Sequence, residues 1–168
     1  LGHYMNEVTI IMEPTVMEYG SLKIGMVPWM APDNEEQTLT FLKNAKCSVI
    51  GGHFDIIGSE MFRGFINEHG LSPDRFKRFE MVLSGHFHVK SSKDNIHYLG
   101  SQMEFFWSDA HDNKYFHILD TETLDLLPIQ NPHRLFEKIL YDDTKEDYLT
   151  CPLDHLDEKF VKVVVVNK

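Results

Sequence analysis

Histidines that follow two strand-like segments are the part of this sequence best suited to chemistry. His53 comes after the apolar run 47–50 and two glycines, and His86 and His88 come after the run 80–83 in the order Gly-His-Phe-His. Imidazole is a good ligand for zinc, manganese or iron, and a glycine before each motif permits a bend of the chain. The pattern indicates a metal site at two strand ends, although strand-end histidines can also be ordinary polar residues.

Short strands and one helix are expected to position these histidines. Apolar and β-branched runs predict strands at 8–12, 22–27, 47–50, 80–83, 96–100, 115–119, 124–129 and 135–141, with a hairpin turn at 120–123. A helix is expected after Pro32, with Asp33 or Asn34 as its cap and an end near Lys46. Together these elements predict a mixed α/β fold.

The two ends of the sequence suggest a piece of a longer chain. It begins with Leu1 rather than Met, and residues 1–4 look like the end of a helix. The run 160–166 is nearly continuous valine, which is typical of a buried strand. Such a strand should not lie bare. We therefore expect that the natural chain continues or that a neighbouring molecule covers this strand.

Composition and charge exclude several classes of protein and one mode of DNA binding. The 168 residues are 42% hydrophobic and 25% charged, which is typical of a soluble globular protein and excludes disordered, fibrous and disulfide-rich classes. The net charge of -10 has the wrong sign for a broad DNA-binding face, and six of these ten charges fall in residues 142–158. DNA binding would therefore need metals or a partner. Cys47 and Cys151 are expected to be free thiols, and no apolar run is long enough to cross a membrane.

Five blocks of sequence resemble the phage recombination endonuclease subunits. These are related to the SbcD-type double-strand-break repair nucleases, in the calcineurin-like metallophosphoesterase superfamily. The two Gly-His motifs look like the last two signature motifs of that superfamily. The resemblance covers residues 1–141, and more weakly the rest. The blocks are Val-Pro-Trp-Met at 27–30, Gly-Gly-His-Phe at 51–54, Ser-Gly-His-Phe-His at 84–88, Tyr-Leu-Gly-Ser at 98–101 and His-Ile-Leu-Asp-Thr-Glu-Thr at 117–123.

The resemblance implies a fold, a site and partners. The fold would be part of the four-layer phosphoesterase β-sandwich flanked by helices, lacking its N-terminal half. Residues 1–141 would be the C-terminal portion of the nuclease domain, and residues 142–168 the start of a cap or partner-binding region. His53 and His86 would bind one metal ion and His88 a second, with Mn²⁺ as the favoured ion. The partners would be DNA and an SbcC-type ATPase, in the cytoplasm of a bacterial host.

The earlier motifs of the superfamily are missing. The sequence has no Gly-Asp-x-x-Asp and no Gly-Asn-His-Asp, and no Asp-x-His precedes the Gly-His motifs. The bridging aspartate, the asparagine ligand and the histidine that protonates the leaving group are therefore absent, and His3 does not replace them. Without a bridging carboxylate two dications repel each other, so we expect at most one weakly bound ion and an inactive isolated chain. Apolar surface left bare by the missing half should make the chain a homo-oligomer.

Two other functions stay open at this point, a metallophosphatase acting on small phosphomonoesters and a non-catalytic partner-docking fragment. Some residues outside the histidine motifs also allow two interpretations. The basic run 75–78 is expected to be solvated rather than to bind phosphate, and the aromatic run 105–107 is either core or an exposed rim. Asp109, beside that run, is a candidate hydrogen-bond acceptor supporting the site.

Overall fold

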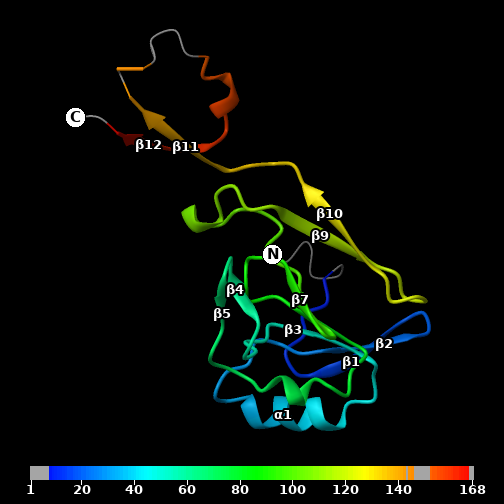
Figure 1. The fold of residues 1–168 in the computed structure, drawn as a ribbon. Coiled ribbons are helices and arrows are strands. Elements are labelled where there is room, and N and C mark those ends of the chain that lie inside the picture. Colours follow the sequence, from blue (N-terminus) through cyan, green and yellow to red (C-terminus); the bar gives the residue numbers. More distant parts are fainter. Residues whose placement is uncertain (1–7, 143, 146–151, 167–168) are drawn as a thin grey trace.

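A computed structural model describes residues 8–142, 144–145 and 152–166, and in this part the protein is mostly β-strand with one α-helix (Figure 1). Its main sheet has six strands. In spatial order they are β1 (Thr15–Tyr19), β2 (Leu22–Met26), β3 (Val49–Gly52), β6 (Met81–Ser84), β8 (Ile96–Tyr98) and β7 (Ser91–Lys93). The four inner strands are parallel, and the two edge strands are antiparallel to their neighbours. Parallel inner strands place their carboxyl ends at one edge of the sheet.

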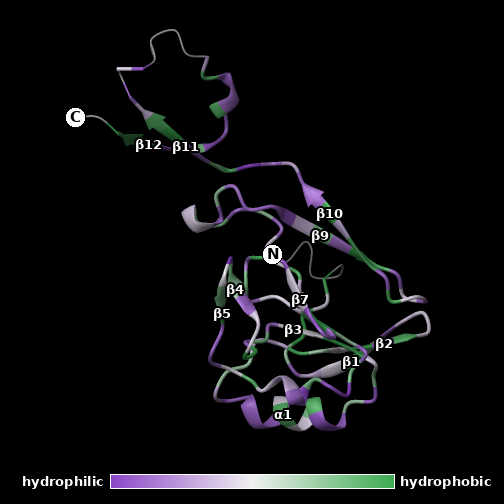
Figure 2. Cartoon of the chain, in the orientation of Figure 1, coloured by the Kyte–Doolittle hydropathy of each residue, from purple (hydrophilic) through white to green (hydrophobic). Residues whose placement is uncertain are grey.

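Both faces of this sheet are covered, so its strands carry apolar residues on both sides. On one face Ile50 and Val82 pack with Leu42 of the helix α1 (Glu35–Asn44). On the other face Val49 and Met81 pack against leucines of the hairpin formed by β9 (Lys114–Leu119) and β10 (Leu126–Asn131). Figure 1 shows α1 and this hairpin on opposite sides of the sheet, and Figure 2 shows the hydrophobic strands between them.

The predicted helix is confirmed, and its C-terminal carbonyls have a partner outside it. Asn34 precedes α1, but its amide does not cap the helix. The Asn34 Oδ1 atom instead accepts a hydrogen bond from the Ala31 amide at 2.8 Å, and Nδ2 donates to the Trp29 carbonyl at 2.9 Å. At the other end the Arg78 guanidinium donates to the carbonyls of Leu42 and Ala45, which satisfies groups that a helix end leaves unpaired. Arg78 of the basic run is thus a structural residue.

The strand predicted at 8–12 is wrong. Residues 8–12 form neither a helix nor a strand, and within the described part of the chain they pair with no strand. β1 begins after Pro14 instead and joins β2 through the two-residue turn Gly20-Ser21, in which Gly20 has φ +62°. A two-residue turn pairs the residues directly on either side of it, so the strand beside β2 is the segment that immediately precedes the turn. The Gly-Ser pair was the signal for this hairpin.

The valine-rich strand forms, and no other described residue buries it. β12 (Phe160–Val165) pairs in parallel with β11 (Phe136–Tyr141), and all six of its residues are exposed. The two strands make a sheet of their own with no third strand in the described residues. A two-stranded sheet has no second layer to bury its apolar side chains.

The other predicted strands are confirmed with ends shifted by up to two residues, as β2, β3, β6, β8, β9, β10 and β11. The sequence did not predict β4 (Glu60–Phe62), β5 (Phe65–Ile66) or β7, nor the short 3-10 helices η1 (Pro73–Arg75), η2 (Trp107–Asp109) and η3 (Asp154–Leu156). Cys47 is a free, half-buried thiol. The predictions for residues 1–4, His3 and Cys151 fall outside the described residues. In the described part no helix has the length and hydropathy needed to cross a membrane.

Candidate functional site

His53 and His86 meet where β3 and β6 end. These strands are parallel neighbours in which Gly52 pairs with Ser84, so each histidine leaves the sheet at the same edge. The two ring centroids are 5.1 Å apart and the rings are nearly perpendicular. The backbone amide of His86 donates a hydrogen bond to His53 Nδ1 at 3.2 Å. The predicted convergence of these two imidazoles is confirmed.

The bend at the second motif lies at His86 rather than at the glycine before it. His86 has φ +71°, a left-handed conformation that a non-glycine residue seldom adopts and that is often found at functional sites. Gly85 provides room instead, because a Cβ atom there would lie 3.0 Å from His53 Nδ1. Glycine at position 85 therefore permits the two histidines to approach each other.

The loop that carries His53 is anchored through the peptide groups of Phe54. The Ser84 hydroxyl accepts a hydrogen bond from the Phe54 amide at 3.0 Å and donates to its carbonyl at 3.1 Å. The Tyr98 hydroxyl donates to the same carbonyl at 2.9 Å and accepts from the Ile56 amide at 3.1 Å. Ser84 and Tyr98 come from adjacent strands, so the sheet itself fixes the loop after His53.

Trp29 and Asp55 complete the surroundings of the histidine pair. The Trp29 ring lies 4.5 Å from the His53 ring, centroid to centroid, and is 61% exposed. Asp55 Oδ1 lies 3.9 Å from His86 Nε2. The sequence analysis assigned a role to neither residue. The signal for Asp55 was its spacing, two residues after His53, because alternate residues of an extended chain point to the same side.

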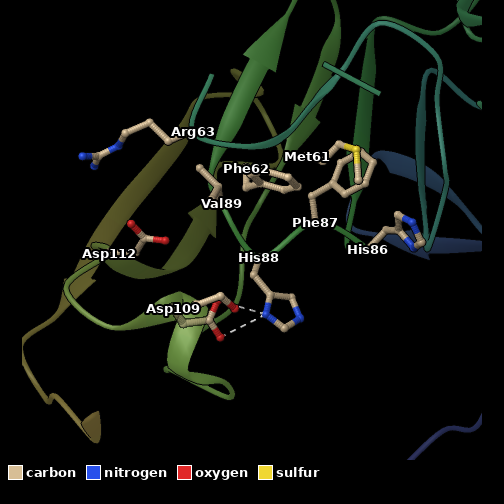
Figure 3. A pocket seen from close by; sticks show the side chains of 10 residues that line it. Met61, Phe62, Arg63, His86, Phe87, His88, Val89, Asp109 and Asp112 are labelled. Carbon is tan, nitrogen blue, oxygen red and sulfur yellow. Dashed lines mark hydrogen bonds and ion pairs between the residues drawn. The ribbon is translucent and has the colours of Figure 1, made fainter. Parts of the chain in front are cut away.

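His88 lies apart from the other two histidines. Figure 3 shows the His86 and His88 rings pointing to different sides of the loop that carries both. His88 Nδ1 is 3.1 and 3.2 Å from the two carboxylate oxygens of Asp109. Its ring is stacked on Phe106, with centroids 5.5 Å apart. Asp109 is thus the hydrogen-bond acceptor that the sequence suggested.

Asp109 belongs to a buried ionic cluster. Its carboxylate accepts hydrogen bonds from the amides of Phe105 and Phe106 at 2.9 and 3.0 Å, and Lys114 Nζ lies 3.3 Å away. Burial acts to raise the pKa of Asp109, but these amides, His88 and Lys114 together outweigh it and lower the pKa. An ionised Asp109 favours a proton on His88 Nδ1, which leaves Nε2 as a free ligand atom. Lys114 is almost fully buried, and the sequence analysis did not identify it.

The electrostatic surroundings of His53 favour its neutral form. Its pKa is lowered first by burial and then by the neighbouring imidazoles of His86 and His88. Because Nδ1 accepts the His86 amide, the neutral ring carries its proton on Nε2. A metal could bind His53 only after this hydrogen bond breaks.

The described residues do not by themselves make a complete metal site. Among residues 8–142, 144–145 and 152–166, no three His, Cys, Asp or Glu side chains are grouped so that they could hold an ion. Protein metal sites commonly use three or four such ligands. The histidine pair is therefore at most part of a ligand set.

A cleft of about 530 Å³ lies beside His86 and His88. It is bordered by Phe62 and Arg63 of the β4–β5 hairpin on one side and by Asp109 and its neighbours on the other (Figure 3). The cleft joins the two histidines that the sequence placed in one motif.

The aromatic run 105–107 divides between rim and core. Phe105 and Phe106 are 54% and 63% exposed beside His88, whereas Trp107 packs against Phe136 with ring centroids 4.8 Å apart.

In the basic run 75–78, Phe76 is fully buried, while Arg75 and Lys77 are exposed as expected.

Comparison with known proteins finds one informative similarity. No family model matches the chain. It is 33% identical to Exonuclease subunit 1 of Enterobacteria phage T4 over 123 residues, which is 73% of this chain and 36% of that protein. The chain thus spans little more than a third of the relative. The similarity relates this chain to part of a phage nuclease subunit.

Proposed function

We propose that this chain is part of a metal-dependent DNA nuclease subunit that hydrolyses phosphodiester bonds in recombination and repair. The observation that carries the proposal is the meeting of His53 and His86 at adjacent parallel strand ends, 5.1 Å apart. The similarity to Exonuclease subunit 1 supports it. In this proposal the six-stranded sheet is one part of a four-layer metallophosphoesterase sandwich.

The proposed metal ligands are His53 and His86 for one ion and His88 for a second, with manganese as the metal. Two such ions would activate water and stabilise charge at the phosphodiester. Asp109 supports this role by holding His88 Nδ1, and Asp55 lies 3.9 Å from His86 Nε2. The remaining ligands must come from outside the described residues, so the 168-residue chain is expected to bind one ion weakly and to be inactive alone.

The proposed partners follow from charge and exposed surface. A chain with a net charge of -10 needs metals or another protein to approach DNA. We propose an SbcC-type ATPase as that protein, with residues 142–168 as part of a cap or partner-binding region. The exposed apolar side chains of β12 fit such a role or the contact of a homo-oligomer.

Manganese binding to the 168-residue chain tests the ligand assignment. Titration followed by the electron paramagnetic resonance signal of free Mn²⁺ is expected to show one weak site. His86→Ala should abolish that binding, while His133→Ala, which changes an exposed histidine on another loop, should leave it unchanged. Equal binding by the His86→Ala variant and the unchanged chain would contradict the assignment.

Activity requires the longer protein that contains this sequence. With manganese it is expected to cleave linear duplex DNA, and His86→Ala should abolish cleavage without unfolding, because His86 is not a core residue. A chromogenic phosphomonoester serves as the second substrate. Hydrolysis of the monoester without DNA cleavage would favour a metallophosphatase instead.

A further inference from the structure

We propose that the β4–β5 hairpin binds the unpaired end of a DNA strand, stacking a base on Phe62 and contacting a phosphate through Arg63. The hairpin borders the cleft that His86 and His88 line. This inference rests on the proposed nuclease function and deepens it, since it names the form of DNA that reaches the histidines.

The hairpin presents its two aromatic rings in a defined arrangement. Phe62 pairs with Phe65 across the turn Arg63-Gly64, and their ring centroids are 4.5 Å apart. Gly64 has φ +83°, and its amide donates to Glu60 Oε1 at 2.9 Å, which closes the turn. The turn therefore places Arg63 at the tip of the hairpin, next to Phe62 in sequence.

The residues at the tip of the hairpin do not pack into the hydrophobic core. Phe62 is 48% exposed and Phe65 is 59% exposed. Arg63 is exposed and makes no hydrogen bond or ion pair with another described residue. Exposed rings beside an unpaired guanidinium suit single-stranded nucleic acid, because bases stack on aromatic faces and the cation meets the phosphate backbone.

The cleft gives the bound strand access to the histidines. Phe62 and Arg63 line the same cleft of about 530 Å³ as His86 and His88. Figure 3 shows Phe62 between Arg63 and His86, with Arg63 at the outer edge. A base stacked on Phe62 would therefore place the adjoining phosphate within the cleft that leads to the imidazoles.

Charge favours an unpaired strand over a duplex. Asp112 also lines the cleft, and Asp109 there is already paired with Lys114. A duplex held through its phosphates needs a broad cationic surface, which a chain of net charge -10 does not offer. A base stacked on an aromatic ring adds affinity through the ring itself, and Arg63 supplies the cation for one phosphate.

Fluorescence anisotropy of a labelled oligothymidylate tests the proposal on the 168-residue chain, at low salt and with EDTA. We expect Phe62→Ala to weaken binding about tenfold, the loss of one base–aromatic stack. Arg63→Ala should weaken binding and lower the slope of log affinity against log salt by about 0.7, the value for one phosphate contact on a single strand. Phe116→Ala and Lys43→Ala, which change exposed residues of β9 and α1, are the matched controls and should bind as the unchanged chain does.

A blunt duplex of the same length should bind more weakly than the single strand. The proposal is overturned if the chain does not bind the oligonucleotide, if the hairpin variants bind as well as the controls, or if the duplex is preferred. Because EDTA removes metal, the result is independent of the manganese titration. If the chain binds the oligonucleotide as expected but does not bind manganese, only the proposed metal site is contradicted. If it binds manganese as expected but the hairpin variants bind the oligonucleotide as well as the controls do, only the proposed role of the hairpin is contradicted.

Discussion

The part of the chain up to Tyr98 and the part after it are stabilised in different ways. Among the residues that the structure describes, every buried hydrophobic residue except Phe136 lies between Leu22 and Tyr98. After Tyr98 the buried side chains are mostly charged, namely Glu104, Asp109, Lys114 and Asp142. The first part is a sheet packed on both faces. The second consists of two separate two-stranded sheets, of which the β9–β10 sheet packs leucines against the main sheet, while hydrogen bonds from the amides of Leu135 and Phe136 to Glu104 attach the segment that leads into β11.

The candidate site depends on both parts of the chain. His53 and His86 stand on the apolar-packed sheet, where Ser84 and Tyr98 fix the local backbone. The orientation of His88 instead depends on Asp109, in the charged cluster of the second part. Apolar packing is non-directional, whereas a buried charge needs partners with defined geometry. Changes in the two parts should therefore affect stability differently.

The largest effect is expected in the sheet core. Phe76 is fully buried and packs on Phe54, with ring centroids 5.0 Å apart. Phe76→Ala should lower the free energy of unfolding by about 3–5 kcal/mol because it leaves a cavity. Urea unfolding measures this change. The control is Phe105→Ala, which removes a ring that is 54% exposed and should change stability by less than about 0.5 kcal/mol. Similar losses in both variants would show that the sheet is not the stabilising core.

A smaller effect is expected from the buried carboxylate that attaches β11. Glu104 accepts hydrogen bonds from the amides of His111, Leu135 and Phe136 and from Arg134. Glu104→Gln turns one acceptor into a donor that faces backbone N–H groups, so we expect a loss of about 2–3 kcal/mol in urea unfolding. An unchanged stability would mean that this cluster does not hold β11.

Stability should also depend on pH through Glu104. Burial acts to raise its pKa, but the hydrogen bonds from Phe136, Leu135, His111 and Arg134 outweigh burial and lower the pKa below 4.5. A lowered folded-state pKa stabilises the protein fully above about pH 4.5, and this contribution is lost as pH falls through the folded-state value. Urea unfolding between pH 3 and 7 should show a smaller acid loss for Glu104→Gln than for the unchanged chain. Equal slopes would contradict the assignment.

The loop after His53 offers an intermediate test at the site itself. Ser84→Ala removes the hydroxyl that pairs with the Phe54 amide and carbonyl, and we expect a loss of about 1 kcal/mol. Tyr98 still holds the carbonyl, so the chain should remain folded. Amide hydrogen exchange at Phe54 should become faster, while exchange in β9 should not change. Unchanged protection at Phe54 would show that the loop does not depend on Ser84.

The smallest effect is expected in β12. Val163 is 57% exposed, so Val163→Thr should change the free energy of unfolding by less than about 0.5 kcal/mol. Unfolding should be followed at two protein concentrations. A loss above 1 kcal/mol that depends on concentration would show that another copy covers this strand, and the contrast between the two parts of the chain would then apply only to the monomer.

The sequence by itself determined most strands, the helix and the two histidines at adjacent strand ends. Apolar runs reveal strands because buried side chains must be apolar, and parallel strands place their carboxyl ends together, so His53 and His86 were predictable neighbours. The five sequence blocks that resemble phage recombination endonuclease subunits can likewise be found from the order of residues alone. These properties are local or follow from one rule of sheet geometry.

Only the tertiary structure decided which predicted elements are paired or buried and where each side chain points. Residues 8–12 and 160–165 have the β-branched composition of strands, but pairing and burial depend on which other segments come near. The orientation of His88 depends on Asp109, which is 21 residues away in sequence, and on the buried Lys114. Contacts between residues that are distant in sequence leave no periodic pattern in it. The ionic cluster around Asp109 and the β4–β5 hairpin could therefore be found only in the tertiary structure.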